Sequence, residues 1–315
     1  MSDVLETSLN TLAVGGLYAL IALGYTLVYG ILRFINFAHS DIVSWGAWLC
    51  FTLASAAGWL GSGGAPWFAL PMVLLASMAI CAVMGVTIER LAYRPLRHAP
   101  RLNVLITAIG VSLFLQNVGL LEKVFGTRPK TIAPLLANTV LGTVAGVEIR
   151  LFQVVTIVLT IVLVVALERL VYGTRMGRAM RAVAHDEKTA SLMGVNVSVV
   201  IAVTFAVGSA LAAAGGVLFA FRNDLRQTAD PSWVLLGLKA FVAAVVGGIG
   251  NVRGAAAGAG LIAFVELFVH HYVNEIFHDK PWVGQLQDIY VFGILILVLL
   301  FKPNGLFGKA GVEKV

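Results

Sequence analysis

GTRMGRAMRAVAHDEKTASLMGVNV, residues 173–197, is the longest polar passage between two apolar runs in this chain of 315 residues. It carries Arg175, Arg178, Arg181 and Lys188, and both neighbouring runs are long enough to cross a lipid bilayer. A basic stretch between two such runs predicts a loop in water that joins two membrane spans. The function therefore depends on what this loop contacts.

The composition is that of an integral membrane protein. Hydrophobic residues make up 59% of the chain and charged residues 12%, and the mean hydropathy is +0.91. A soluble domain has about 25% charged residues. The net charge of +6 does not indicate nucleic acid, because the basic residues lie beside the apolar runs, as orientation signals do.

The apolar runs predict an all-α, polytopic transmembrane bundle of eight or nine spans, since a spanning helix needs about 20 residues. Segments 42–60, 233–249 and 285–301 are shorter than the others, so these three could be tilted, broken or re-entrant. The nine segments are 11–32, 42–60, 67–89, 102–121, 151–168, 197–221, 233–249, 254–273 and 285–301.

The positions of Lys and Arg predict the orientation of the bundle. With the N-terminus outside, the inner connections hold 14 Lys and Arg in 67 residues, and the outer connections hold 7 in 67 residues. This twofold excess favours an N-out, C-in arrangement with an odd number of crossings. The inner connections would include Arg90, Arg94, Arg97, Arg101 and the stretch 173–197.

Small residues at spacings of four predict close packing between helices, because glycine and alanine let two backbones approach in lipid. A path lined by backbone is the alternative interpretation. Gly247, Gly248 and Gly250 also predict a break or tight turn before Asn251. The two small-residue rows are Gly208, Ala212 and Gly216, and Gly250, Gly254 and Gly258.

Two polar joints suggest an internal repeat. One ends at His39-Ser40-Asp41 before Ser44-Trp45-Gly46, and the other ends at Ala229-Asp230-Pro231 before Ser232-Trp233. The first joint is expected inside and the second outside. Two units offset by five spans would then form an inverted repeat, which places a transport path at the interface of the units.

Enzymatic and metal-binding chemistry finds no support in the sequence. No Gly-x-x-x-x-Gly-Lys-[Ser/Thr] phosphate loop is present, and Gly248-Ile-Gly250 lacks the third glycine of a dinucleotide site. His270, His271 and His278 are better interpreted as a wet helix end than as metal ligands, since no carboxylate spacing completes a site. We expect neither a catalytic site nor a metal site.

Ionisable groups within apolar runs are costly in a membrane and therefore indicate function. Lys239 and Glu266 each lie about 10 Å below the expected outer boundary, at 1.5 Å per residue. We predict that they pair, because either charge alone would be expensive to bury. Outward extension of Lys239 to the membrane surface is the alternative.

Further polar groups are candidates for a translocation path. The joint Arg33-Phe-Ile-Asn36-Phe-Ala-His39-Ser40-Asp41 separates two apolar runs, and Asp41 is interpreted first as the N-cap of the next helix. The joint's polar residues could instead line a path or contact a neighbouring subunit. Interhelical hydrogen bonds are the alternative role for the polar groups within the spans. The candidate path residues are Tyr25, Asn36, His39, Gln116, Asn117, Lys239 and Glu266.

Three motifs in order resemble the LivH-type permeases of branched-chain amino acid ABC importers, and the resemblance extends over nearly the whole chain. They are Asn36-Phe-Ala-His39, the run 175–195, and Val246-Gly-Gly-Ile-Gly250-Asn-Val-Arg-Gly254. The resemblance implies one permease domain, residues 1–315, in the bacterial inner membrane. Its implied partners are a LivM-type permease, two cytoplasmic ATPases that bind ATP and Mg²⁺, and a periplasmic binding protein. It implies no cofactor in this chain itself.

The resemblance also places an ATPase-coupling helix at Asp186–Gly194, within a cytoplasmic segment at about 173–196. The family's usual EAA spelling is absent, and Asp186-Glu187-Lys188-Thr189-Ala190 stands there instead, so position supports the role. Asp186 and Glu187 suit a helix N-terminus, and Gly194 suits its end. Ala190, Leu192 and Met193 are predicted to form an apolar contact patch. A helix lying on the membrane surface is the alternative.

The residues are compatible with several functions. Urea, amides or aromatic acids could replace branched-chain amino acids as the substrate of a similar permease. An ion-coupled secondary carrier is an alternative in which Lys239 and Glu266 would serve coupling. A membrane-embedded enzyme is disfavoured, because the sequence shows no converging His, Asp or Glu set at membrane depth.

Overall fold

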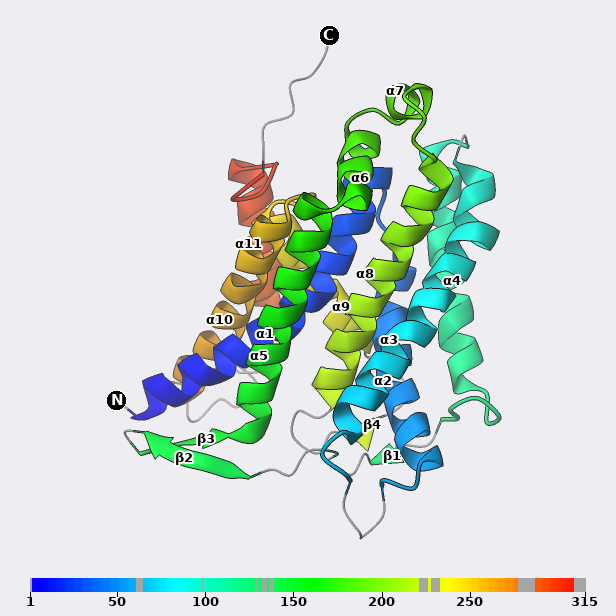
Figure 1. The fold of residues 1–315 in the computed structure, drawn as a ribbon. Helices are drawn as coiled ribbons and strands as arrows, with labels where there is room; N and C mark the ends of the chain where they lie inside the picture. Colours follow the sequence, from blue (N-terminus) through cyan, green and yellow to red (C-terminus); the bar gives the residue numbers. More distant parts are fainter. Residues whose placement is uncertain are drawn as a thin grey trace.

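The computed structural model describes residues 2–60, 65–97, 99–127, 130–131, 135, 139–144, 146–220, 226–227, 233–276 and 287–308. A bundle of long helices forms its body, and two short helices project from one end of it (Figure 1). The bundle helices are α1 (Ser2–Leu32), α2 (Ala38–Ala56), α3 (Ala69–Ile88), α4 (Arg101–Leu120), α5 (Leu151–Glu168), α8 (Val197–Ala220), α9 (Trp233–Gly247), α10 (Val252–Ile276) and α11 (Gln287–Phe301).

These helices coincide with the apolar segments predicted from the sequence. Helix α5 has the predicted bounds, whereas α1 begins nine residues earlier than predicted, at Ser2. The polar first turns of α1 bond within the helix, as in the 2.7 Å bond from Thr11 Oγ1 to the Thr7 carbonyl. In the described part of the chain six helices are long and apolar enough to cross a membrane, so the protein is a polytopic membrane protein.

Some helices are connected through short strands. The all-α prediction did not include these strands. Strands β2 (Val140–Val144) and β3 (Val147–Arg150) form a hairpin, and β1 (Lys130–Thr131) pairs antiparallel with β4 (Arg226–Gln227). They lie at the end of the bundle opposite to the two projecting helices (Figure 1). The prediction is correct for the bundle but not for these connections.

Helix α1 lies at the centre of the core and packs against α5, α8, α9 and α10. Leu17, Leu20 and Leu23 are fully buried. Helix α8 packs against α1, α2 and α3 at small residues. A Cβ at Gly208 would lie 3.2 Å from the Gly24 carbonyl oxygen, and one at Gly216 would collide with the Val43 carbonyl oxygen. Both predicted packing glycines of α8 therefore lie where two backbones approach closely.

A tight turn joins α9 to α10. Gly248 and Gly250 have φ values of +107° and +92°, which glycine adopts readily. The turn predicted here is thus confirmed, but Gly250 precedes α10 and is not part of its packing face. Gly254 and Gly258 do lie on α10, against Gly247 and Ala243 of α9 respectively. The last described segment crosses this turn, with Leu306 N–H donating to the Val246 carbonyl at 2.8 Å.

Helix α2 begins inside the bundle rather than at its end. Arg33 has a φ of +54° and ends the helical run of α1, and α2 starts at Ala38. The first turn of α2 lies beside Ile21 and Tyr25 of α1, which it contacts through His39 and Ser40. Tyr25 precedes the end of α1 by seven residues, or about 10 Å. Of the three short segments, 42–60 therefore belongs to a helix that starts within the bundle.

Candidate functional site

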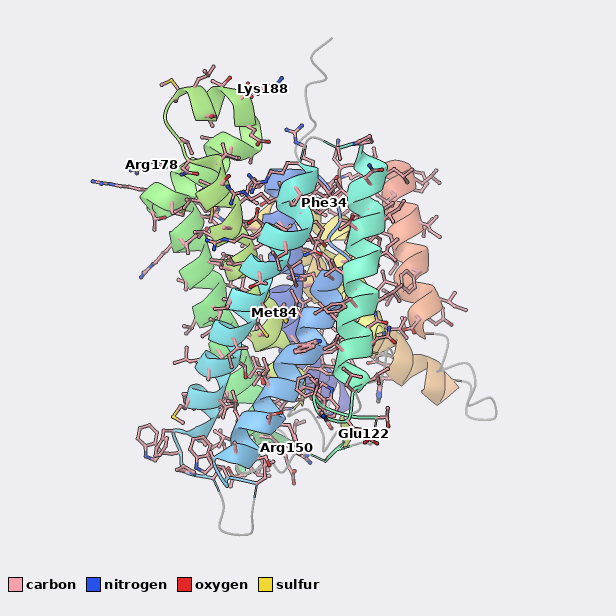
Figure 2. All side chains as sticks on the ribbon, turned by 90° about the vertical axis from the view of Figure 1, so that its right-hand side faces the viewer. Phe34, Met84, Glu122, Arg150, Arg178 and Lys188 are labelled. Atoms are coloured by element: carbon pink, nitrogen blue, oxygen red, sulfur yellow. The ribbon has the colours of Figure 1, made fainter. Side chains whose placement is uncertain are left out.

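Residues 173–197 contain two consecutive helices at one end of the bundle, α6 (Arg175–His185) and α7 (Glu187–Leu192), and α7 lies farther out (Figure 1). Thr174 caps α6, since its Oγ1 accepts a hydrogen bond from Gly177 N–H at 3.0 Å. Gly177 lies against the carbonyls of Leu170 and Val171 in a π-helical turn, η3 (Arg169–Gly173). Figure 2 shows the Arg178 side chain extending away from the bundle. It also shows Lys188 on α7, at the end of the molecule.

Helix α7 has a well-formed start and end. Asp186 Oδ1 accepts hydrogen bonds from Lys188 N–H at 3.0 Å and Thr189 N–H at 3.2 Å. The Thr189 hydroxyl donates to Asp186 Oδ2 at 2.6 Å and, together with the backbone donors, lowers the pKa of Asp186 below its ordinary value. Gly194 ends the segment with a φ of +83°, as predicted.

Only part of the predicted apolar patch on α7 is available to a partner. Leu192 is 87% exposed and Met193, just after the helix, is 80% exposed. Ala190 is instead buried, in a small cluster with Met180, Val183 and Val200. This corrects the prediction that Ala190 contributes to the patch: packing against α6 and α8 turns it inward, and it anchors α7 to them.

Arg33 connects α6 to the joint between α1 and α2. Its guanidinium donates to the carbonyl of Ala184 at 3.3 Å, next to the last residue of α6. Helix α6 also packs against α1 and α8. This hydrogen bond joins the end of α6 to the joint that leads to the buried start of α2.

The first buried polar cluster surrounds this start of α2. Tyr25 and Ser40 share a hydrogen bond of 2.6 Å between their hydroxyl oxygens, and His39 Nε2–H donates to the Ile21 carbonyl at 3.2 Å. The hydroxyl of Tyr93 donates to Asn36 Oδ1 at 2.6 Å. Each of these polar side chains is at most 4% exposed. The cluster thus unites three predicted path residues, Tyr25, Asn36 and His39, within the protein.

Asp41 extends the cluster to α4. The prediction that Asp41 is the N-cap of α2 is wrong. Helix α2 begins three residues earlier, so Asp41 lies in its first turn. Gln116 Nε2 donates to Asp41 Oδ1 at 2.9 Å, and the other carboxylate oxygen is buried without a hydrogen-bond partner. Asn117 faces away: it is exposed, and its amide bonds to the Leu113 carbonyl within α4.

The second buried polar cluster contains the predicted ion pair. Lys239 Nζ lies 2.9 Å from Glu266 Oε1, as expected from their common depth. It also lies 2.7 Å from Asp288 Oδ1 on α11, and Tyr18 OH donates to Glu266 Oε2 at 2.7 Å. Sequence reasoning missed Tyr18 and Asp288. The spacing of seven between Tyr18 and Tyr25, on one face of α1, was a usable signal.

The two clusters lie next to each other around α9. The ring of Phe241 contacts that of Tyr25 at a centroid distance of 5.7 Å, and Gly237 lies against Ser40. Lys239 follows two residues after Gly237 on the same helix. Helices α1, α2, α9 and α10 therefore surround a polar zone within an otherwise apolar bundle.

Metal-ligating side chains do not gather in the described residues, in which no group of three or more His, Cys, Asp or Glu could hold an ion. Of the three histidines singled out by sequence, His278 and the side chain of His270 lie outside the described residues. His271 is placed, and its ring contacts that of Tyr272.

A helical membrane bundle with buried polar groups and a short helical arm at one end has the architecture of a transport subunit. The chain belongs to the family of permease components of branched-chain amino acid transport systems, whose model matches residues 7–300. As a permease component, it is a transport subunit within a system of several proteins.

Similar proteins cover almost the full length of the chain. It is 41% identical over 314 residues to the high-affinity branched-chain amino acid permease BraD of Pseudomonas aeruginosa, covering 99% of this chain and 98% of BraD. It is 38% identical over 316 residues to LivH of Escherichia coli, covering 99% and 97%. The probable permease LivM of Methanocaldococcus jannaschii is 30% identical over 179 residues, covering 53% of this chain and 49% of LivM. No solved structure was found to match the chain.

Proposed function

We propose that this chain carries branched-chain amino acids across the bacterial inner membrane as one of two permease subunits in an ATP-driven importer. The observation that carries the proposal is helix α7, a capped helix outside the bundle whose exposed end presents Leu192 and Met193. An apolar patch on a small projecting helix suits the groove of a soluble partner. That partner would be an ATPase, with ATP and Mg²⁺ bound on it.

The orientation we propose is N-out and C-in, with nine crossings and α7 in the cytoplasm. The end of the bundle near α7 also holds Arg33, which contacts α6, and Arg97, which contacts Ser198 at the start of α8. Basic residues at one end support a cytoplasmic placement. Residues 1–315 would then form one permease domain with residues 173–196 as its coupling segment.

Transport in this proposal follows from movement of the arm. Hydrolysis on the ATPase would displace α7, whose buried Ala190 moves α6 with it, and Arg33 would carry the displacement to the start of α2. Breaking and reforming the hydrogen bonds of Tyr25, Asn36 and His39 would then alternate access to a path beside α1 and α9. Gln116, Lys239 and Glu266 would border that path, and the exposed Asn117 would face a neighbouring subunit.

An inverted repeat would place this path at the interface of two units. Its support is that α2 and α9, which follow the two polar joints, pack against each other where Gly237 meets Ser40. The second joint, at Ala229–Ser232, lies outside the described residues.

The remaining partners are a LivM-type permease and a periplasmic binding protein that delivers the substrate. The local likeness of this chain to a LivM supports pairing of two related permeases. The binding protein would set most of the specificity, so urea, amides or aromatic acids remain alternative substrates. A direct assignment would come from the ligand bound by the binding protein that restores uptake.

The coupling role is tested by placing a charge in the patch. Leu192→Asp and Met193→Asp are expected to lose co-purification of the ATPase and substrate-stimulated ATP hydrolysis while membrane insertion stays normal. Leu141→Asp is the matched control, because Leu141 is 57% exposed on β2 at the opposite end. Normal uptake and hydrolysis in both α7 variants would refute the role. Uptake that needs no ATPase and stops with an uncoupler would favour an ion-coupled carrier instead.

A further inference from the structure

A groove lies between α3 and α8 near the end of the bundle that carries α6 and α7. Its volume is about 410 Å³. Helix α3 continues there into a π-helical turn, η1 (Glu89–Tyr93), and a 3₁₀ turn, η2 (Arg94–Leu96). One end of the groove is polar and is lined by Glu89, Arg90, Arg94, Asn196 and Ser198.

The polar end has an excess of positive charge. Glu89 is 1% exposed and is paired with Arg97, whose guanidinium also donates to Ser198 Oγ at 3.0 Å. Arg90 and Arg94 are exposed, and neither has a carboxylate partner among the residues that the structure describes. With Glu89 neutralised by Arg97, two arginines remain free to bind an anion.

The start of α8 adds polar groups to the same end. Asn196 precedes α8, and its side-chain oxygen accepts a hydrogen bond from Val199 N–H at 3.2 Å. The N-terminus of a helix attracts negative charge, because its first N–H groups point outward along the helix axis. The helix start and the two arginines therefore favour the same kind of ligand.

The groove becomes apolar with depth on both of its walls. On α3, Val86 lies one helical turn before Arg90, and on α8 the lining continues through Ala202 and Ala206. Val199 is 47% exposed, so this chain leaves the apolar wall partly open. From Ser198 to Ala206 the wall extends about 12 Å along α8 at 1.5 Å per residue.

The height of the groove matches the boundary of a bilayer. Counted from Ala69 at the start of α3, Val86 is about 26 Å along the helix and Arg90 is about 32 Å along it. The hydrocarbon core of a bilayer is about 30 Å thick. With Ala69 at one boundary of the hydrocarbon, Val86 would lie within it, and both arginines would lie beyond its other boundary, near the phosphates on the side of α7.

We propose that this groove binds an anionic phospholipid of the cytoplasmic leaflet. The phosphate would lie between Arg90, Arg94 and the start of α8, and one acyl chain would lie along Val86, Ala202 and Ala206. Basic pockets between helices on the cytoplasmic side suit anionic head groups. The lipid would fill the space between α3 and α8, and so stabilise the contact of these helices.

The test measures lipids retained by the purified full-length permease with native mass spectrometry. Phosphatidylglycerol and phosphatidylcholine of identical acyl chains are offered in equal amounts. We expect preferential retention of phosphatidylglycerol. Arg90→Gln with Arg94→Gln should weaken it about 30-fold, since each basic residue near an anionic surface contributes about 1 kcal/mol.

Matched variants separate the groove from general surface charge. Arg169→Gln with Arg178→Gln removes the same charge from exposed arginines outside the groove, and phosphatidylglycerol should still be retained. Ala206→Leu fills the apolar wall and should weaken retention with all charges intact. Equal retention of the two lipids, or equal losses in the two arginine pairs, would overturn the proposal. Competition by glycerol phosphate alone as effectively as by the lipid would overturn the acyl-chain contact.

Discussion

Within the Lys239–Glu266–Asp288 cluster, substitution of Lys239 should destabilise the protein more than substitution of Glu266. Lys239 is the only cation among these three groups, and its side chain is 11% exposed, compared with 10% for Glu266 and 40% for Asp288. Lys239→Met would leave the Glu266 and Asp288 carboxylates close together without compensation. Glu266→Gln would leave Lys239 paired with Asp288 and would keep an acceptor for Tyr18.

The expected magnitudes follow from these environments. Breaking a buried pair by removing its cation costs about 3–5 kcal/mol of unfolding free energy. Losing one charged hydrogen bond, while the partner keeps another, costs about 1–3 kcal/mol. Lys239→Met should therefore lower the apparent Tm more than Glu266→Gln, by on the order of 10 °C against a few degrees.

The assay is thermal unfolding of the detergent-purified permease, followed by fluorescence-detected size exclusion. The double variant Lys239→Met with Glu266→Gln should be more stable than the sum of the single effects allows, since it removes both buried charges together. The reasoning would be refuted if Glu266→Gln were as destabilising as Lys239→Met. Strict additivity in the double variant would refute it too.

Two further outcomes are expected elsewhere in the chain. Gly216→Leu should reduce the amount of folded protein, because its Cβ would collide with the Val43 carbonyl oxygen, whereas Gly110→Leu should be tolerated because nothing lies within 4 Å. Folded yields would show both. Ionised Asp186 caps α7, so amide exchange at Thr189 should speed up in Asp186→Ala. In the parent protein its protection should persist on acidification and be lost only as the pH falls through the lowered pKa of Asp186. Protection of the Thr189 amide that is fully lost already at pH 5 would contradict the capping role.

Much of the candidate site followed from local rules. The Lys239–Glu266 pair was predictable because two ionisable groups at the same depth in lipid strongly favour each other. The end of α7 at Gly194 followed from glycine's access to positive φ. By contrast, Tyr18 and Asp288 were missed, because nothing in their own surroundings along the chain shows that α1, α10 and α11 meet.

The sequence by itself determined the class of protein, the helices of the bundle and the polar stretch between α5 and α8. These depend on composition and short-range spacing, because each residue of a helix contributes separately to the free energy of placing that helix in lipid. Only the tertiary structure decided that α2 starts inside the bundle, that Ala190 is buried and that Asp41 meets Gln116. These facts depend on which helices pack side by side, and side-chain contacts between distant segments determine that packing.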